Sequence, residues 1–399
     1  MNKKAGKVSK KKRSRTAKRV ERPSEVAFYF GFSEIKSPSV EKVDKEALKP
    51  GRRGSLSDGR KEDINEVEEK ARLLRFYFED TGSYPQHRFL FYRKPLSGIS
   101  FKKRSSNYEC GLDIIGPEGS IAEALIIQSA LSILSEEGFK DLHVAINSIG
   151  DKESINALEK DLAAYYRKNI EHFPSFCRQV FKKDLFEILR TEDERCLESV
   201  ADAPDPLSIL SDNSRLHLKE VLEYLESANI PYVMDKHLVG NPFLMSHTIF
   251  EIRGETKSGK KVVFGSGYRY NYFSKKTGMK KEIPAIGLTL SWKRTKKSTL
   301  RRLPHPKFYL VQLGSFAKLK SLMVIELLRK EKIPVYHALT KDKYGGQSGT
   351  AENMKVPFIL IFGQKEALEN TIAVRDMKTR FQEIIPLGHI SSYLKKLSA

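Results

Sequence analysis

Apolar residues recur at every third or fourth position in several stretches of the chain, a spacing typical of helices that bury one face. The stretch 64–78 shows it clearly, because Val67, Ala71, Leu74 and Phe78 fall on one side of a helix. We therefore expect these four side chains to face the interior. The same spacing predicts helices over 64–78, 121–137, 152–168 and 216–229.

Short runs rich in β-branched and aromatic residues predict strands between these helices. The runs near 89–91 and at 108–115 enclose a basic stretch at 101–107, which predicts an antiparallel hairpin with a positively charged tip. Further strands are predicted at 142–146, 248–252, 261–264 and 285–291, and a helical but irregular segment at 170–215.

The pattern changes after a basic stretch at 293–304, in which six of twelve residues are Lys or Arg and the last is Pro304. Strands then alternate with helices, which predicts a compact α/β domain with a largely parallel sheet. The segment 343–349 (KYGGQSG) lacks the Gly-Lys-Ser/Thr ending of a phosphate-binding loop, so we predict a flexible loop there. The predicted strands are 308–313, 335–338, 358–362 and 371–376, and the predicted helices are 315–331 and 388–397.

The net charge of the chain indicates a class of binding partner. The net charge is +21 and the pI is near 9.6, values that favour a polyanion such as a nucleic acid. Ten of the first 20 residues are Lys or Arg, and we expect residues 1–23 to form a disordered basic tail. The tail lacks the apolar segment of a secretory signal, and no apolar stretch reaches the roughly 20 residues of a membrane span, so no membrane partner is expected.

The cysteines and histidines give no sign of a metal site. Cys110, Cys177 and Cys196 form no Cys-x-x-Cys pair and are odd in number, which argues against a disulfide framework and against zinc. A reducing, cytoplasmic setting is therefore expected. Three histidines that lack ligand spacing relative to cysteine are predicted to be surface or core residues: His172, His237 and His247.

Ten segments of the chain, in unchanged order, resemble histidyl-tRNA synthetases from about residue 24 to the end. In the first part these include FGFSEIKSPSVE (30–41, similar to the first class II motif), DIIGPEGSIAEALIIQSALSIL (113–134) and LHVAINSIGDKESINALEKDLAAYY (142–166). The middle part contains ANIPYVMDKHLVGNPFLMSHTIFEI (228–252), GSGYRY (265–270) and PAIGLTLSWKR (284–294, similar to the third class II motif). KFYLVQLG, IPVYHAL, VPFILIFGQKE and TIAVRDMKT, within 307–379, resemble the anticodon-binding domain shared by the His, Gly, Thr and Pro enzymes.

The resemblance implies a fold and a domain division. It implies an α+β class II core over 24–292, built as an antiparallel sheet with flanking helices and a small helical insertion near 170–215. A basic linker (293–304) and an α/β anticodon-binding domain (305–399) follow. The first motif, a strand ending at Pro38, implies a homodimer.

The same resemblance indicates that catalytic groups have been lost. A class II enzyme needs an arginine that stabilises charge on the α-phosphate in the transition state. The best alignment of LFYRKPLSG with the second motif, anchored on Pro95 and Gly98, puts Phe91 at the catalytic arginine and Arg93 at its acidic partner. A rival alignment makes Arg93 itself the catalytic residue. The histidine-specific motif, at 240–246, has lost its cation, its acid and both aromatic hydroxyls, and no counterpart is found for the amine-binding glutamate expected near residue 70.

Four polar residues remain as a predicted vestigial pocket. The resemblance implies that Glu109 and Asp113 stand at the acceptors of the histidine ring. Arg294 stands at the arginine that stacks on adenine, and Arg93 completes the set. No catalytic residue and no metal ligand is assigned.

These observations predict a non-catalytic synthetase paralogue that binds tRNA or another structured RNA through its C-terminal domain and basic segments. One alternative is a divergent active histidine–tRNA ligase, which would use ATP with Mg²⁺. A second is a histidine-sensing regulatory subunit of the ATP phosphoribosyltransferase type. The predicted RNA-binding residues are Lys10, Lys11, Lys12, Arg13, Lys102, Lys103, Arg104, Lys296, Lys297, Arg301 and Arg302.

Overall fold

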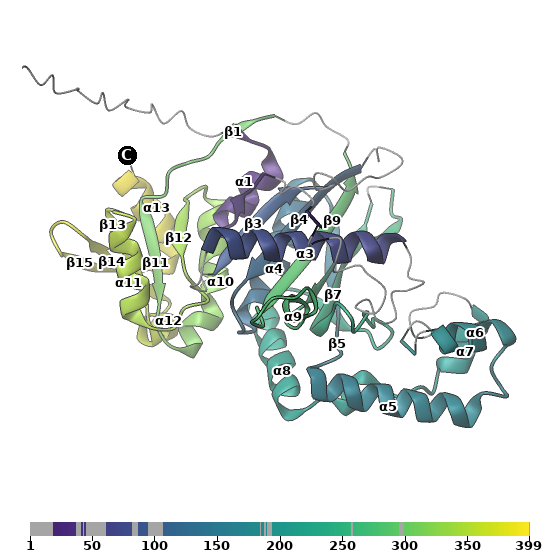
Figure 1. The fold of residues 1–399 in the computed structure, drawn as a ribbon. Helices are drawn as coiled ribbons and strands as arrows, with labels where there is room; N and C mark the ends of the chain where they lie inside the picture. The colour runs from purple at the N-terminus through teal and green to yellow at the C-terminus, as the bar shows by residue number, and fades with distance from the viewer. Residues whose placement is uncertain are drawn as a thin grey trace, which may run out of the picture.

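The computed structural model consists of a sheet-based core, a helical projection and a C-terminal domain (Figure 1). The residues that it describes are 19–36, 41–42, 44, 61–81, 87–94, 107–183, 185–186, 189, 194–256, 258–294 and 299–398. Predictions for Pro38, Pro95 and Gly98 and for the basic residues at 10–13, 102–104 and 296–297 lie outside them.

In the described part of the core, eight strands form one sheet in the order β2-β3-β4-β9-β8-β7-β5-β6. The central strands pair antiparallel, as predicted, whereas β2–β3 and β5–β6 at the two edges pair parallel. The strands are β2 (Ser33–Glu34), β3 (Arg88–Arg93), β4 (Asn107–Ile115), β5 (Lys140–Ser148), β6 (Tyr232–Met234), β7 (Ser246–Glu255), β8 (Lys261–Arg269) and β9 (Ala285–Lys293).

Helices cover both faces of this sheet (Figure 1). The largely apolar α4 (Ile121–Glu136) packs with α8 (Asp212–Ser227) on one face, and α3 (Lys61–Thr81) crosses the other. Val67, Ala71 and Leu74 of α3 are buried as predicted. Phe78 is 53% exposed, so its predicted burial is wrong; it lies in the last turn of α3, which ends at Thr81.

Residues 19–23 form β1 and the start of α1, so the prediction of a disordered tail over 1–23 is wrong for its last five residues. β1 (Arg19–Val20) pairs antiparallel with β10 (Arg301–Arg302), and α1 (Arg22–Tyr29) begins directly afterwards. The buried Val20 side chain and a proline in the first turn of α1 favour this order, although the local composition is basic.

The helical projection contains a disulfide that we did not predict. α5 (Lys152–Asn169) begins at Asp151, whose carboxylate caps the helix, and it leads to α6 (Ser175–Lys183) and α7 (Glu194–Val200). Cys177 on α6 bonds to Cys196 on α7, 19 residues apart, and the argument from the cysteine count against a disulfide is wrong for this pair. The sequence did not reveal this pair, because the two cysteines lie on different helices and only tertiary packing brings their Cα atoms to 5.9 Å.

The C-terminal domain has the predicted alternation of elements but a mixed sheet, in the order β12-β11-β13-β14-β15. β11 pairs parallel with β12 and β13, whereas β13, β14 and β15 pair antiparallel. The predicted largely parallel sheet is therefore wrong, because the connections on both sides of β14 are shorter than a parallel crossover requires. The elements are β11 (Phe308–Gln312), α10 (Ser315–Lys330), β12 (Val335–His337), α11 (Tyr344–Asn353), β13 (Phe358–Phe362), α12 (Gln364–Glu369), β14 (Thr371–Asp376), β15 (Gln382–Pro386) and α13 (Leu387–Ser398).

The stretch 343–349 is not a flexible loop, because residues from Tyr344 onward form α11. The buried Gln347 side chain accepts a hydrogen bond from the Gln312 backbone N–H at 3.1 Å and donates one to its carbonyl at 2.8 Å. These two bonds fix a glycine-rich helix to β11 despite its low intrinsic helix propensity.

The core and the C-terminal domain are in direct contact. His337 of β12 lies against Phe89 of β3 and close to Gly31, and Arg329 of α10 bonds to Glu136 of α4 at 3.0 Å. In the described part of the chain no helix is long and apolar enough to cross a bilayer.

Candidate functional site

The two faces of the core sheet separate the four residues of the predicted vestigial pocket. Side chains alternate between faces along a strand, so Glu109 and Asp113 of β4 face α3. Arg93 and Arg294 contact Tyr108, which belongs to the opposite, α4-covered face. The structure therefore does not bring the four residues together.

The same alternation changes the interpretation of the second motif. Phe91 and Arg93, the two residues on which the alternative alignments depend, both lie on the face away from Asp113. Tyr92 of β3 and Lys94, just after it, instead direct polar groups towards α3. An offset of one residue is enough to move a side chain to the wrong face of a sheet.

Asp113 is the centre of the α3-covered face, and its carboxylate is saturated by the protein itself. Oδ1 accepts hydrogen bonds from Lys70 Nζ at 2.9 Å and from the Tyr270 hydroxyl at 2.6 Å. Oδ2 lies 3.1 Å from Lys70 Nζ and accepts a hydrogen bond from the Tyr92 hydroxyl at 2.8 Å. A carboxylate offers about four acceptor positions, so none is left for a ligand. We call Lys70, Tyr92, Asp113 and Tyr270 the sealed pocket.

Burial and charge act in opposite directions on the sealed pocket. Lys70 is 1% exposed and Asp113 is 0% exposed. Burial raises the pKa of Asp113 above its usual value, and the Lys70 ammonium beside it offsets only part of that rise. The rings of Tyr268 and Tyr270 lie 5.7 and 5.3 Å from the ammonium and add cation–π attraction.

Two glycines on neighbouring strands provide the space for this arrangement. A Cβ atom at Gly287 of β9 would lie 2.3 Å from Lys70 Nζ and 2.4 Å from Asp113 Oδ1. A Cβ atom at Gly111 of β4 would lie 2.2 Å from the Tyr92 ring. The sheet is thus shaped around an internal ion pair.

The segment that resembles the histidine-specific motif packs beside the sealed pocket as apolar core. Val239 and Leu244 are buried in one cluster with Tyr268, Tyr270 and Phe273. Where the resemblance implies an acid, the segment carries Phe243, whose backbone N–H donates a hydrogen bond to the Asn241 side-chain oxygen at 2.9 Å. No charged side chain lies between positions 238 and 246.

A cleft of about 450 Å³ opens next to the sealed pocket on the same face. Lys94 crosses it, with its ammonium 2.8 Å from Glu69 and 3.0 Å from the Thr289 hydroxyl. Three carboxylates face this one ammonium, so the cleft is acidic. We call it the acidic cleft; it is lined by Asn65, Glu66, Glu69, Lys94, Glu109, Val263, Phe264, Gly265, Ser266, Thr289 and Ser291.

The carboxylates of the acidic cleft differ in their ionisation. Burial raises the pKa of Glu66 above its usual value. Burial acts the same way on Glu69, but the ammonium groups of Lys94 and Lys70 outweigh it and hold the pKa of Glu69 below its usual value. Negative charge is therefore fixed at Glu69, beside the Tyr92 hydroxyl at 2.9 Å.

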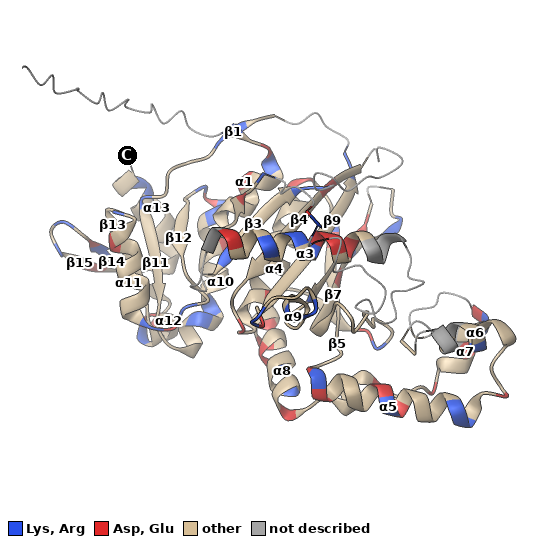
Figure 2. Ribbon diagram, in the orientation of Figure 1, with Lys and Arg blue, Asp and Glu red and all other residues tan. Residues whose placement is uncertain are grey.

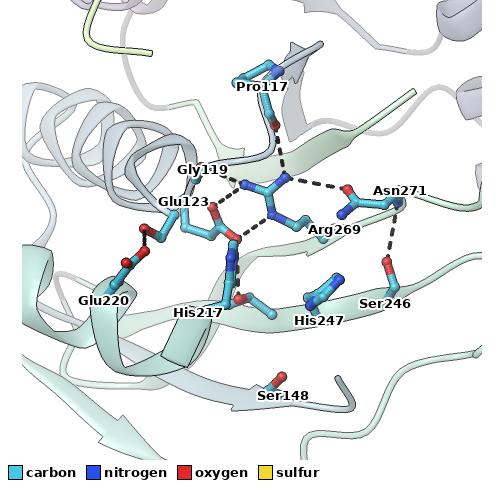
Figure 3. A network of polar contacts seen from close by, with 12 residues as sticks. Pro117, Gly119, Glu123, Ser148, His217, Glu220, Ser246, His247, Arg269 and Asn271 are labelled. Atoms are coloured by element: carbon cyan, nitrogen blue, oxygen red, sulfur yellow. Dashed lines mark hydrogen bonds and ion pairs between the residues drawn. The ribbon is translucent and has the colours of Figure 1, made fainter. Parts of the chain in front are cut away.

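A second buried ion pair, which the sequence did not predict, ties the sheet to its helices (Figure 3). Arg269, at the end of β8, binds both carboxylate oxygens of Glu123 on α4 and the carbonyls of Pro117 and Gly119. His217 of α8 contacts the same carboxylate at 2.6 Å. Burial raises the pKa of Glu123, but Arg269 and His217 outweigh it and lower the value to about 2. The sequence hint to this pair was Arg269 itself, a charged residue within the otherwise uncharged segment GSGYRY (265–270), to which we had assigned no role.

Arg93 and Arg294 meet at the corner where β3, β4 and β9 end. Their guanidinium carbons lie 3.4 and 4.3 Å from the centre of the Tyr108 ring. Glu21, between β1 and α1, contacts both, at 3.7 Å for Arg93 and 3.2 Å for Arg294. These contacts hold the N-terminal segment against the core, on the face of the sheet opposite Asp113.

Of the predicted RNA-binding residues, Arg301 and Arg302 lie in the described part of the chain. Arg301 bonds to Glu25 of α1 at 3.2 Å, which fixes β10 to the core. Arg302 is exposed and stands opposite Arg19 across the β1–β10 pair. The other nine lie outside the described residues, and RNA binding stays a prediction for all eleven.

Comparison with known proteins gives the same order of parts. A family model of the anticodon binding domain matches residues 308–397. The chain is 29% identical to a histidine–tRNA ligase of Bacillus subtilis over 311 residues, which covers 76% of this chain and 72% of that protein. It is 26% identical over 390 residues to a histidine–tRNA ligase of Latilactobacillus sakei, which covers 90% and 88% of the two chains.

Among solved structures, the apo histidyl-tRNA synthetase of S. aureus matches 92% of this chain and 92% of its own, with a TM-score of 0.51. At 23% identity this likeness bears on the fold. The eight-stranded core, the matched C-terminal domain and the two relatives agree, and the chain is a class II histidyl-tRNA synthetase-like protein with a C-terminal anticodon-binding domain.

Proposed function

We propose that this protein binds tRNA or another structured RNA and does not activate histidine. The observation that carries the proposal is the saturation of Asp113 by Lys70, Tyr92 and Tyr270. A ligand with a basic ring or amine would have to displace a buried ammonium group that already has its counter-charge. Displacing one partner of a buried ion pair leaves an uncompensated charge, which is costly.

The acidic cleft supports the same proposal, because its charge is unfavourable for binding ATP. Adenylate formation builds negative charge at the α-phosphate and needs cations placed to receive it. The described lining of the cleft supplies one cation, Lys94, and this ammonium is already bound to Glu69. Phosphate groups entering here would face Glu66, Glu69 and Glu109, so ATP binding is disfavoured.

The C-terminal domain supports RNA binding. Its β14–β15 turn carries Phe381, which is 66% exposed, beside the exposed cations Lys378 and Arg380. Asp376 fixes the turn by accepting hydrogen bonds from the backbone N–H groups of Lys378 and Thr379 at 2.7 and 2.8 Å. An unpaired base can stack on an exposed aromatic ring, while the neighbouring cations contact the phosphate backbone of the RNA.

We also propose a cytoplasmic homodimer. The first-motif resemblance supports the dimer, and the relatives named as histidine–tRNA ligases support a tRNA partner. In a reducing cytoplasm the Cys177–Cys196 disulfide would be largely reduced to two thiols. Sedimentation equilibrium tests the dimer, and a monomer at micromolar concentration contradicts it.

Two assays run in parallel test the proposed function. Histidine-dependent ATP–pyrophosphate exchange is expected to be absent, and filter binding to a tRNA transcript is expected to weaken steeply as salt rises. Histidine-dependent exchange would instead support a divergent active ligase. Histidine binding by calorimetry without any tRNA binding would support a histidine-sensing regulatory subunit. Absence of tRNA binding at about 50 mM salt refutes the RNA-binding proposal.

A further inference from the structure

We infer that Arg19 and Arg302 form a phosphate-binding pair, and that with Arg93 and Arg294 they make one basic corner for the backbone of a structured RNA. This inference rests on the proposed function and adds a site to it. Arg19 and Arg302 face each other in the β1–β10 pair, and Glu21, which follows β1, contacts Arg93 and Arg294 of the core. Figure 2 shows β1 beside α1 at this edge of the core.

The pairing of β1 with β10 places two like charges face to face. Arg19 and Arg302 are direct partners in the antiparallel register. Directly opposite residues of an antiparallel pair have Cα atoms about 4.5–5.5 Å apart, and like charges in that position repel. Both arginines are exposed, and neither has an acidic partner among the residues that the structure describes. An anion shared by the two guanidinium groups would remove the repulsion.

The neighbouring position shows how the chain neutralises a cation when it serves the fold. Arg301 is the partner of Val20 in the same two-residue pair, and its guanidinium bonds to Glu25 at 3.2 Å. Val20 is buried. One residue of each strand therefore anchors the pair to the core, while Arg19 and Arg302 are left to face solvent. The contrast is between adjacent residues of one strand, so general basicity of the chain does not explain it.

Glu21 brings two more arginines to the same corner. This residue follows β1 directly, and its carboxylate contacts both Arg93 and Arg294. One carboxylate thus serves two guanidinium groups, and the Arg93 side chain remains 45% exposed. The corner carries a surplus of positive charge in a fixed geometry, because both guanidinium groups stack against the buried Tyr108 ring.

The chemistry of the guanidinium group identifies the ligand class. Arginine binds phosphate oxygens through paired N–H groups in one plane, and two arginines on adjacent strands can hold one phosphate between them. Tyr108, the aromatic residue that both Arg93 and Arg294 contact, is buried, so these described contacts offer no exposed ring on which a base could stack. Contacts to phosphate position a nucleic acid without reading its sequence.

The experiment is a salt series of filter binding with the full-length protein, a tRNA transcript and a DNA duplex. The test variant is Arg19→Ala/Arg302→Ala. The control, Lys236→Ala/Lys260→Ala, removes the same charge from exposed positions beside β6 and in the β7–β8 turn. A plot of log affinity against log salt has a negative slope, and each lost phosphate contact makes this slope shallower by about 0.9. We expect the test variant to lose about one to two units of slope and roughly tenfold in affinity at about 50 mM salt, for both probes.

Thermal unfolding of the same variants without nucleic acid separates a binding role from a structural one. Removal of the opposed charges is expected to leave the unfolding midpoint unchanged or slightly raised. An unchanged salt slope, or a slope that the control lowers equally, overturns the inference even where the wild-type protein binds tRNA. A lowered midpoint that fully accounts for the lost affinity also overturns it. If the wild type binds neither probe, the proposed function fails with it, whereas binding to the DNA duplex alone refutes only the RNA assignment.

Discussion

The Lys70 ammonium lies 2.9 Å from the Asp113 carboxylate, and both side chains are shielded from solvent at the centre of the core. In the synthetase resemblance Asp113 stands at an acceptor for the substrate. Here a cation of the chain itself occupies that acceptor, so a residue of α3 closes the pocket from inside. The consequences for stability can be measured directly.

Replacement of Lys70 by methionine is expected to lower the free energy of unfolding by about 3–5 kcal/mol, because it leaves Asp113 buried without its counter-charge. The double variant Lys70→Met/Asp113→Asn is expected to recover most of this loss, since the asparagine is neutral and still bonds to the tyrosine hydroxyls. Urea denaturation of the wild type, both single variants and the double variant gives the coupling energy. Additive losses in the double variant would contradict the ion pair.

Acid is expected to destabilise the protein between about pH 6.5 and pH 4. Burial first, and then the nearby His217 and Arg269, lower the pKa of His247 to about 4, while Glu123 and Asp151 act in the opposite direction. The unfolded chain takes up a proton near pH 6.5 that the folded protein accepts only near pH 4, so stability falls as the pH is lowered through this window. The expected loss is on the order of 3 kcal/mol.

His247→Asn is the matched variant, because His247 has a φ of 51° and asparagine tolerates that conformation. Burial also lowers the pKa of His337 to about 4, so the variant should remove part of the pH dependence rather than all of it. Urea midpoints at pH 7, 5.5 and 4.5 measure the effect. Equal pH dependence in variant and wild type would show that His247 is not involved.

Reduction of the Cys177–Cys196 bond is expected to loosen the helical projection. Cross-linking residues 19 apart restricts the unfolded segment by roughly 3 kcal/mol. Limited proteolysis should therefore cut between α6 and α7 faster when a reductant is present. The variant Cys177→Ser/Cys196→Ser should be cut at the fast rate with or without reductant. If the oxidised wild type is cut as fast as the reduced wild type, the prediction is refuted.

Phe381→Ala is expected to weaken tRNA binding by roughly 5- to 150-fold, the range that corresponds to about 1–3 kcal/mol for one stacked base. The slope against salt should stay unchanged, because no charge is removed. Leu368→Ala is the control, since Leu368 of α12 is similarly exposed. Equal affinity for both variants would exclude base stacking at the β14–β15 turn.

The sequence by itself determined much of the element order and the division of the chain. Helical spacing gave α4, α5 and α8 to within a few residues, and the basic stretch ending at Pro304 marked the change to the C-terminal domain. These features follow from local periodicity and turn chemistry, which are properties of short segments. The absence of charged residues at 240–246 was also visible, because it depends only on residue identity.

Only the tertiary structure decided which polar residues meet. Arg93 and Asp113 seemed to share a pocket, but the two-residue period of the strands puts them on opposite faces of the sheet. The Lys70–Asp113 pair and the Arg269–Glu123 pair join residues 43 and 146 positions apart, and no local pattern specifies such contacts. The facing of Arg19 and Arg302 likewise required the two ends of the core to be folded against each other.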